Sequence, residues 1–178
     1  DPIEGERGAR PWALTPEAYG KFLCGLFDVY YRDWVNGDYT SVRLFDDYIH
    51  MAMGMPAGTC ATSGSCGAYF VVEGDGTVYP CDFYCLDEWK MGRIGEQSIP
   101  ELANSEKARL FLQQGERKPD ACADCRWYSL CHGGCKRDWV ENDGKLENYS
   151  CLAFKEFFAY AESRILEIAR AEAEYYRS

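Results

Sequence analysis

Ten cysteines give this sequence its strongest chemical signal. The tightest group follows the spacing C-x2-C-x5-C-x3-C and consists of Cys122, Cys125, Cys131 and Cys135. Two thiolates separated by two residues can bind one metal centre, and Gly133 and Gly134 allow backbone N–H groups to approach sulfur closely. Taken alone, this group predicts a compact zinc site with four thiolate ligands.

The other cysteines would have no role around a single zinc ion. The next candidate ligands are Cys60, Cys66, Cys81 and Cys151, which together with the first group provide eight thiolates, enough for two sites of four. Two zinc ions are one interpretation of this count. Two iron–sulfur clusters are the other, since the last cysteine of a tight run in ferredoxins can ligate the second cluster. Two free thiols are left over, Cys24 in an apolar helical pattern and Cys85.

Disulfide bonds are the competing explanation for so many cysteines. A chain of 178 residues can bury roughly 70% of its unfolded surface and does not depend on covalent cross-links to fold. No basic region followed by an apolar stretch marks a secretory signal. We therefore expect a reducing compartment, the cytoplasm, and cysteines that bind metal. The chain opens with Asp1-Pro2 in place of Met, which indicates a processed or shortened protein.

The charge balance argues against two classes of partner. Lys and Arg number 19 and Asp and Glu number 29, which gives a net charge of −10. Nucleic acids and anionic membrane surfaces both require a basic face, so we expect no nucleic-acid partner and no membrane partner. No run approaches the roughly 18 apolar residues that a membrane-spanning helix requires.

Three segments of different character must position the thiols. In the first, residues 1–55, Thr15 and Pro16 predict the start of a helix that runs to about Trp34 and ends at Asn36-Gly37-Asp38. Ser41–Ile49 is interpreted as a short extended segment. A helix followed by a strand is half of an α/β repeat, or else the start of a self-contained α+β domain.

The second segment, residues 56–151, holds nine of the ten cysteines. Tyr69–Val72 and Thr77–Tyr79 flank a Gly-containing turn and predict a β-hairpin. Ile99 begins a predicted helix that runs to about Leu112, with three core candidates, Leu102, Leu110 and Phe111. Residues 142–145 predict a turn.

The third segment, residues 152–178, predicts one amphipathic helix from Leu152 to about Tyr176 that packs on the preceding domain. A coiled-coil partner helix is the weaker interpretation, because the apolar stripe is too short for several heptads. The residues that line this stripe are Phe154, Phe157, Phe158, Ala161, Ile165, Ile168 and Ala169.

The order of the cysteines, with a Gly-containing hairpin between Cys66 and Cys81, resembles the SPASM domain of radical S-adenosylmethionine (SAM) enzymes. Three shorter stretches narrow the resemblance to the anaerobic sulfatase-maturating enzymes: Tyr79–Tyr84 (YPCDFY), Glu88–Gly92 (EWKMG) and Cys131–Cys135 (CHGGC). The similarity runs from about Cys60 to Cys151. It extends weakly upstream, where residues 1–55 would be the end of the family's partial (β/α) barrel and a linker.

The resemblance implies an α+β fold in which a hairpin and helices surround two 4Fe–4S clusters, followed by a long C-terminal helix. It implies that Asp82, directly after Cys81, is the general base; the structural alternative is a turn aspartate bonded to the backbone. The implied ligands of the first cluster are Cys60, Cys66, Cys81 and Cys135. Those of the second cluster are Cys122, Cys125, Cys131 and Cys151.

The implied activity is the oxidation of a Cys or Ser of a sulfatase to Cα-formylglycine by a 5′-deoxyadenosyl radical. The sulfatase polypeptide would be the substrate, and a ferredoxin or flavodoxin would donate electrons. The C-x3-C-x2-C motif that binds the SAM-cleaving cluster does not occur in these residues. We therefore expect SAM and a third cluster in a missing N-terminal part, and no activity from this chain alone.

Two other classes of protein remain open. Another peptide-modifying radical SAM enzyme would keep the cysteine pattern, and a zinc-binding interaction module would use it without catalysis. Near the thiols, we expect Lys136 and Arg137 to offset cluster charge, and His132 to lie beside a cluster without ligating it. Packing around the clusters is the expected role of Trp89, Trp127 and Trp139.

Overall fold

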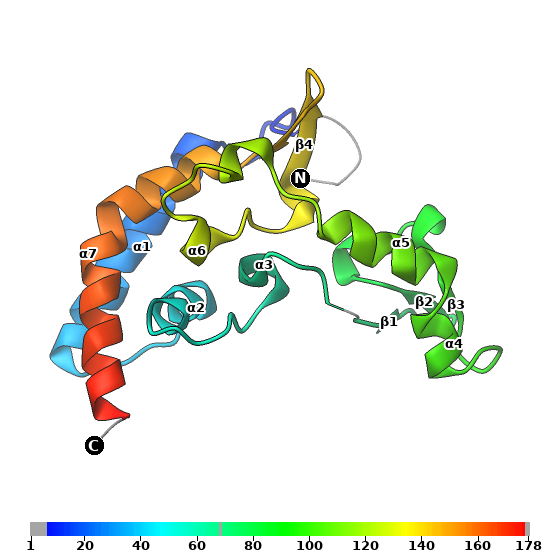
Figure 1. Ribbon diagram of the computed structural model, residues 1–178, viewed down its shortest axis with the longest axis horizontal. Helices are drawn as coiled ribbons and strands as arrows, with labels where there is room; N and C mark the ends of the chain where they lie inside the picture. The colour runs from blue at the N-terminus through cyan, green and yellow to red at the C-terminus, as the bar shows by residue number, and fades with distance from the viewer. Residues whose placement is uncertain (1–6, 68, 177–178) are drawn as a thin grey trace.

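Three helices at one end of the molecule pack against each other although the sequence separates them. They are α1 (Pro16–Asn36), α2 (Arg43–Ala52) and α7 (Cys151–Tyr175), and they occupy one side of an arched body (Figure 1). The computed structural model describes residues 7–67 and 69–176. The predicted first and last helices are confirmed, with bounds close to the expected ones.

The start and the end of α1 follow from its terminal residues. The Thr15 hydroxyl accepts a hydrogen bond from the Ala18 N–H at 3.2 Å, and Pro16 occupies the first helical position. Gly37 ends the helix with φ 79°, a left-handed conformation that glycine adopts without strain.

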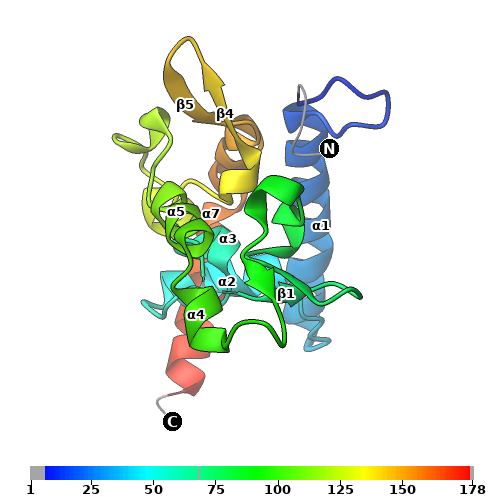
Figure 2. The same cartoon turned by 90° about the vertical axis from the view of Figure 1, so that its right-hand side faces the viewer.

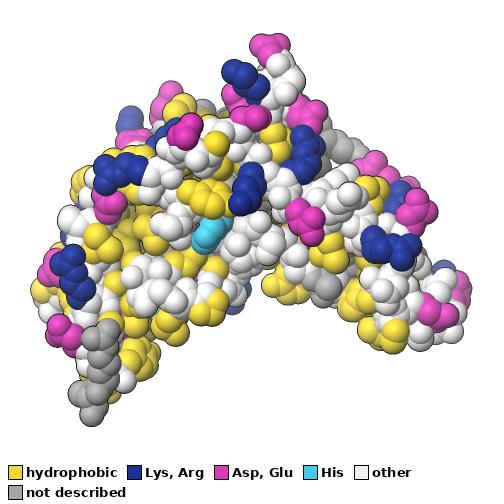
Figure 3. Space-filling model, viewed as in Figure 1, with side chains coloured by type: hydrophobic (Ala, Val, Ile, Leu, Met, Phe, Trp, Pro, Cys, Tyr) yellow, Lys and Arg dark blue, Asp and Glu magenta, His cyan; other side chains and the backbone are white. Residues whose placement is uncertain are grey.

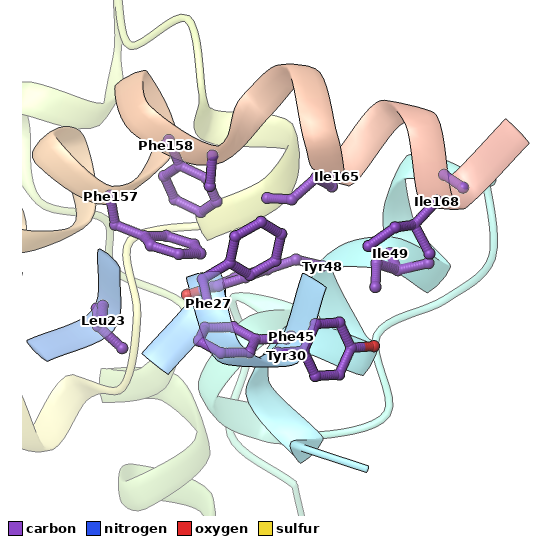
Figure 4. Packing of buried hydrophobic residues seen from close by; sticks show 12 residues of the cluster. Leu23, Phe27, Tyr30, Phe45, Tyr48, Ile49, Phe157, Phe158, Ile165 and Ile168 are labelled. Carbon is purple, nitrogen blue, oxygen red and sulfur yellow. The ribbon is translucent and has the colours of Figure 1, made fainter. Parts of the chain in front are cut away.

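The core of this end consists of aromatic and branched side chains from all three helices (Figure 4). The Phe157 ring of α7 stacks on the Phe45 ring of α2, with centroids 5.4 Å apart. Phe27 of α1 meets both of these rings edge-on, at 5.0 and 5.5 Å. Residues from opposite ends of the chain therefore share one core, and α7 packs on α1 and α2 as its apolar stripe predicts.

The extended segment predicted over Ser41–Ile49 is wrong, because residues 43–52 form α2. Phe45, Tyr48 and Ile49 are all buried and recur at a spacing of three and four residues, which places them on one face of a helix. The strand interpretation missed this period. The α/β half-repeat inferred from it is absent from this part of the chain.

A small antiparallel sheet occupies the other end of the arch (Figure 1). Its strands are β1 (Val71–Val72), β2 (Thr77–Tyr79) and β3 (Gly92–Arg93), in the order β1-β2-β3. The predicted hairpin is confirmed, although its first strand is shorter than expected. The Asp75 carboxylate fixes the turn by accepting hydrogen bonds from the N–H and the hydroxyl of Thr77, each at 2.8 Å.

The helix predicted from Ile99 to Leu112 is two helices, α4 (Ile99–Ala103) and α5 (Glu106–Gly115). Each has its own serine cap. Ser98 forms a capping box with Glu101, and the Ser105 hydroxyl accepts the Ala108 N–H at 3.1 Å. The break changes the register, so that Leu102 and Phe111 are buried as predicted, whereas Leu110 is 40% exposed and is not a core residue.

The middle of the arch consists of short elements. A hairpin of β4 (Trp139–Asn142) and β5 (Lys145–Asn148) closes at the predicted turn and projects from the molecule near the start of α7 (Figure 2). Two short helices, α3 (Cys60–Ser63) and α6 (Tyr128–Cys131), face each other below it. Four 3₁₀ turns complete the described elements: η1 (Asp82–Tyr84), η2 (Asp87–Trp89), η3 (Asp120–Cys122) and η4 (Lys136–Asp138).

The mixture of helices with two small antiparallel sheets confirms an α+β fold. On the face in Figure 3, hydrophobic side chains gather over the helical half and along the concave edge of the arch. None of the described helices combines the length and the apolar character needed to cross a bilayer. The segment boundaries at residues 55 and 151 stay predictions, and the outer ends of the first and third segments lie outside the described residues.

Candidate metal centres

Four cysteines from separate elements lie together between the sheet and the helical half. We call them the first cysteine group: Cys60 begins α3, Cys66 follows it, Cys81 precedes η1 and Cys135 precedes η4. Burial raises the pKa of Cys66, and the Cys60 thiol raises it further. Burial likewise raises the pKa of Cys135, and Asp138, Cys60 and Cys66 add to the effect.

Cys81 belongs to this group because its thiol interacts electrostatically with that of Cys135. Burial raises the pKa of Cys81 to about 12, and the Asp82 carboxylate and Cys135 contribute. A thiol with such a pKa keeps its proton at neutral pH until a metal displaces it, so metal binding at this group would release protons.

The remaining four candidate ligands form the second cysteine group, and all four line one small pocket. Burial raises the pKa of Cys131 to about 12, and the pKa is raised further by the other three cysteines. The group consists of Cys122 at the end of η3, Cys125 after it, Cys131 at the end of α6 and Cys151 at the start of α7.

One turn separates the two groups. Cys131 and Cys135 are four positions apart, yet they belong to different groups, because three consecutive residues between them reverse the chain. His132, Gly133 and Gly134 have φ values of 50°, 86° and 68°, all left-handed. A Cβ at Gly134 would lie 2.7 Å from the side-chain nitrogen of Asn148, so this position has no room for a larger residue.

The donor sets fit iron–sulfur clusters, because each group offers four cysteine thiols and thiolates are the usual ligands of cluster iron. Among residues 7–67 and 69–176, no three His, Cys, Asp or Glu side chains are arranged as a site for a single metal ion. All ten cysteines are free thiols, so none is consumed by a disulfide.

A second observation supports this fit at the second group. The indole Nε1 of Trp127 is buried and has no hydrogen-bond partner among the described residues. Trp127 lines the same pocket as the four thiols. A buried N–H donor without an acceptor is rare in folded proteins, and the sulfur atoms of a cluster in this pocket would provide one.

Asp82 lies at the surface beside the first group, as the first residue of η1. Its Oδ1 accepts a hydrogen bond from the Cys81 thiol at 3.3 Å. A turn aspartate would instead accept a hydrogen bond from a backbone N–H. The hydrogen bond from Cys81 needs the thiol proton. Once Cys81 binds a metal as a thiolate, the carboxylate is free to accept a proton from another molecule at the surface.

The two left-over cysteines lie in different surroundings. Cys24 is on α1, packed against the helical core, and its charged neighbours are Glu156, Asp28 and Arg164. Cys85 donates a weak hydrogen bond to the carbonyl oxygen of Cys81 at 3.7 Å, so it is a spare thiol next to the first group.

Sequence reasoning missed a buried carboxylate that holds the Cys60 helix. Asp47 of α2 is 4% exposed, and its Oδ1 accepts the Gly58 N–H at 3.0 Å. Its Oδ2 accepts the hydroxyls of Thr59 and Thr62 at 2.8 and 2.6 Å. These three bonds fix the turn that leads into α3. An acidic residue on the buried face of a helix indicates such a role, but the strand predicted over residues 41–49 did not place Asp47 on a helix.

His132 connects this turn to the segment between the two groups. Its Nδ1 lies 2.7 Å from the Thr62 carbonyl oxygen, at the end of α3. A Cβ at Gly64 would lie 2.7 Å from the Cβ of His132, so the two segments are in close contact. His132 is thus beside the first group and bonded to the backbone.

Lys136 is almost completely buried against the first group, which its position after Cys135 did not predict. It is 8% exposed, and its Nζ donates a hydrogen bond to the Phe111 carbonyl oxygen at 2.9 Å. Burial lowers the pKa of Lys136 to about 8, and the opposing influence comes from Cys66, Cys81 and Cys135. The other cation predicted there, Arg137, lies over the exposed ring of Phe83 at 4.1 Å.

Comparison with known proteins identifies the class of this site. Residues 64–126 match the family model of SPASM, an iron–sulfur cluster-binding domain. The matched range contains Cys66, Cys81, Cys122 and Cys125, and it ends before Cys131. Residues 64–126 are therefore similar to the iron–sulfur cluster-binding domain of the SPASM type, in agreement with the resemblance in the cysteine order.

The particular relatives are anaerobic sulfatase-maturating enzymes. The chain is 40% identical over 171 residues to a cysteine-type enzyme from Clostridium perfringens, covering 95% of this chain and 46% of that protein. It is 30% identical over 164 residues to a serine-type enzyme from Bacteroides thetaiotaomicron, covering 88% of this chain and 39% of that protein. It is therefore homologous to these enzymes along nearly its whole length, and the resemblance is confirmed.

The fold agrees with this relationship. The solved structure of native anSMEcpe with bound AdoMet and Cp18Cys peptide superposes with a TM-score of 0.89 at 40% identity, covering 96% of this chain and 48% of that one. The chain thus spans about half the length of the relatives that it matches.

Removing the Asp47 carboxylate tests its role in positioning Cys60. Asp47→Ala removes the acceptor of one N–H and two hydroxyls, of which the Thr62 hydroxyl is buried, and a buried donor left without an acceptor costs about 1–3 kcal/mol. We expect the iron bound to the first group to be lost or to dissociate faster, whereas Asp47→Asn retains an acceptor and most of the iron. Iron content per chain and the EPR signals of the reduced protein measure both effects.

Asp46→Ala is the matched control, because the neighbouring carboxylate on α2 accepts instead from the Tyr30 hydroxyl, at 2.8 Å. Iron retention by Asp47→Ala equal to that of Asp46→Ala would show that Asp47 does not position Cys60.

Proposed function

We propose that this chain holds the two auxiliary 4Fe–4S clusters of a radical SAM sulfatase maturase. The first cluster is bound by Cys60, Cys66, Cys81 and Cys135, and the second by Cys122, Cys125, Cys131 and Cys151. The observation that carries the proposal is the separation of eight thiols into two interleaved groups of four, in a chain homologous to sulfatase-maturating enzymes.

The proposed reaction of the whole protein is the oxidation of a sulfatase Cys or Ser to Cα-formylglycine. The higher identity to the cysteine-type enzyme, 40% against 30%, favours a cysteine substrate. SAM and a third cluster would belong to a part of the protein outside these 178 residues, in which C-x3-C-x2-C does not occur. Residues 1–55 would be the end of its partial barrel, contributing α1 and α2.

The proposed division of labour follows from the balance of the reaction. Oxidising the substrate's CH₂–XH group to CH=X, where X is sulfur or oxygen, removes one hydrogen atom, one proton and one electron. Where X is sulfur, water must then replace it and release hydrogen sulfide to give the aldehyde. The SAM-binding part of the whole protein would supply the radical that takes the hydrogen atom, and the clusters held by the cysteines would supply an acceptor for the electron. Asp82 takes the proton, because its carboxylate is at the surface next to Cys81 and loses its own donor when Cys81 becomes a ligand.

The proposed surroundings follow from the same chemistry. The unmodified sulfatase polypeptide is the substrate, and a ferredoxin or flavodoxin reduces the protein. Eight thiolate ligands and two further thiols without disulfide bonds fit a reducing compartment, for which we propose the cytoplasm.

Ligand substitutions test the interleaved assignment. Two 4Fe–4S clusters correspond to about eight irons per chain. We expect Cys135→Ala and Cys125→Ala each to lose about half of this iron, but to remove different EPR signals from the reduced protein, because the two residues serve different clusters. The measurement is iron and sulfide content together with EPR of anaerobically purified protein.

Cys24→Ala is the control and should keep all the iron, because Cys24 lies apart from both groups. A colourless anaerobic preparation with about two zinc ions per chain would contradict the proposal and favour the zinc-binding module. Loss of the same EPR signal in both variants would contradict the crossed assignment.

The role of Asp82 predicts a variant that binds iron but does not turn over. In the complete enzyme, Asp82→Asn should lower formylglycine formation on a sulfatase peptide by about 10²–10⁴-fold, the usual contribution of a general base. Mass spectrometry of the peptide measures the product, and iron content should equal that of the unsubstituted protein.

Asp87→Asn removes a nearby exposed carboxylate that pairs with Lys90, and it should leave the rate unchanged. Equal rates for Asp82→Asn and Asp87→Asn would remove Asp82 from the reaction. Absence of formylglycine with the unsubstituted enzyme would favour another peptide-modifying enzyme of the SPASM type.

A further inference from the structure

Lys136 carries a buried positive charge that no carboxylate balances. None of the ion pairs among the described residues includes Lys136. Its side chain is nevertheless among the few buried polar groups of the protein. An isolated buried ammonium is costly, so a charge of opposite sign should lie next to it.

The surroundings of the ammonium provide only part of that balance. One of its three N–H donors goes to the Phe111 carbonyl oxygen. The Nζ also lies 3.4 Å from the ring centroid of Phe111, 4.9 Å from that of Tyr84 and 5.2 Å from that of Trp89. Aromatic faces stabilise a cation, but they carry no net charge.

The thiols of the first cysteine group, which would become anionic as cluster ligands, lie next to this enclosure. Cys66 and Cys81 pack against the aromatic cluster of Tyr84, Trp89 and Phe111, and Cys135 directly precedes Lys136 in the chain. The lysine is therefore at the point where these segments meet. Its aromatic enclosure and its hydrogen bond to α5 hold it there.

We propose that Lys136 holds a positive charge beside the first cluster and thereby raises its reduction potential. The inference rests on the proposed function, because it assumes that the first group binds a cluster. Reduction adds a negative charge to a site that is already anionic. A fixed cation stabilises the reduced form more than the oxidised form, and burial strengthens the effect by limiting screening.

Replacing the lysine by an uncharged residue of similar shape tests this proposal. We expect Lys136→Met to shift the midpoint potential of the first cluster to more negative values and to leave the second cluster unchanged. Lys136→Arg, which keeps the charge, should leave the potential close to that of the unsubstituted protein. The measurement is a redox titration followed by EPR on anaerobically purified protein, with the first-cluster signal assigned by its loss in Cys135→Ala.

Lys118→Met is the matched control. Lys118 also lies over an aromatic ring, that of Tyr128 at 4.8 Å, but its side chain is exposed. Its loss should leave the first-cluster potential where it is. An unshifted potential in Lys136→Met, or an equal shift in Lys118→Met, would overturn the role of Lys136. An absence of cluster iron in the unsubstituted protein would instead overturn the proposed function.

The unpartnered indole of Trp127 carries a second inference for the other cluster. Its ring stacks with that of Phe158, with centroids 6.4 Å apart, and the guanidinium of Arg126 lies 5.0 Å from its centroid. These contacts restrict the ring, and an indole N–H can only donate. Trp127 shares its pocket with all four thiols of the second group.

We infer that the Trp127 N–H donates a hydrogen bond to a sulfur atom of the second cluster and raises its reduction potential, since hydrogen bonds to sulfur favour the reduced form. Trp127→Phe keeps an aromatic ring and removes the donor. The same titration should show a negative shift of the second cluster and none of the first, which is the reverse of Lys136→Met. An unshifted second cluster, or a loss of its iron without a shift, would overturn this inference.

Discussion

The reversal of the chain between Cys131 and Cys135 is the constraint on which the arrangement of the two cysteine groups depends. The two thiols are close in sequence but face different groups, and only a run of left-handed residues turns the backbone sharply enough. Two of the three residues are glycines, for which this conformation is free of strain. The third, His132, occupies it at a cost of roughly 1–2 kcal/mol. Its contact with the Thr62 carbonyl oxygen helps to offset that cost.

The helical half of the molecule acts as the scaffold for thiols that otherwise lie on loops and short turns. The aromatic core of α1, α2 and α7 borders the second group through Cys131 and Phe158, and the three helices position one member of each group. Cys151 begins α7, so the packing of that helix on α1 fixes a ligand of the second group. Asp47 projects from α2 and fixes the turn before Cys60, a ligand of the first group. Both proposed clusters would therefore tie the cysteine-rich segment to the helices.

Much of this was predictable from the sequence, and the exceptions have a common cause. Spacing and caps predicted α1, α7, the first hairpin and the turn of the second, because those signals are local. The two groups of four cysteines followed from a resemblance, since no local rule assigns Cys131 and Cys135 to different sites. Two partners remote in sequence were missed: Asp47 with the Cys60 turn, and Lys136 with the ring of Phe111. Trp127 was expected to pack near a cluster, and it lines the pocket of the second group. The strand predicted over residues 41–49 is wrong because Phe45, Tyr48 and Ile49 recur at the three- and four-residue spacing of a helix.

The central claim is that two iron–sulfur clusters are held by interleaved cysteines. A crystal structure of the anaerobically purified protein, with anomalous diffraction recorded at the iron absorption edge, tests it directly. The account predicts two separate cubes of iron density. One should lie among Cys60, Cys66, Cys81 and Cys135, and the other among Cys122, Cys125, Cys131 and Cys151. A single metal site bound by Cys122, Cys125, Cys131 and Cys135 together, or anomalous signal at the zinc edge only, would contradict it.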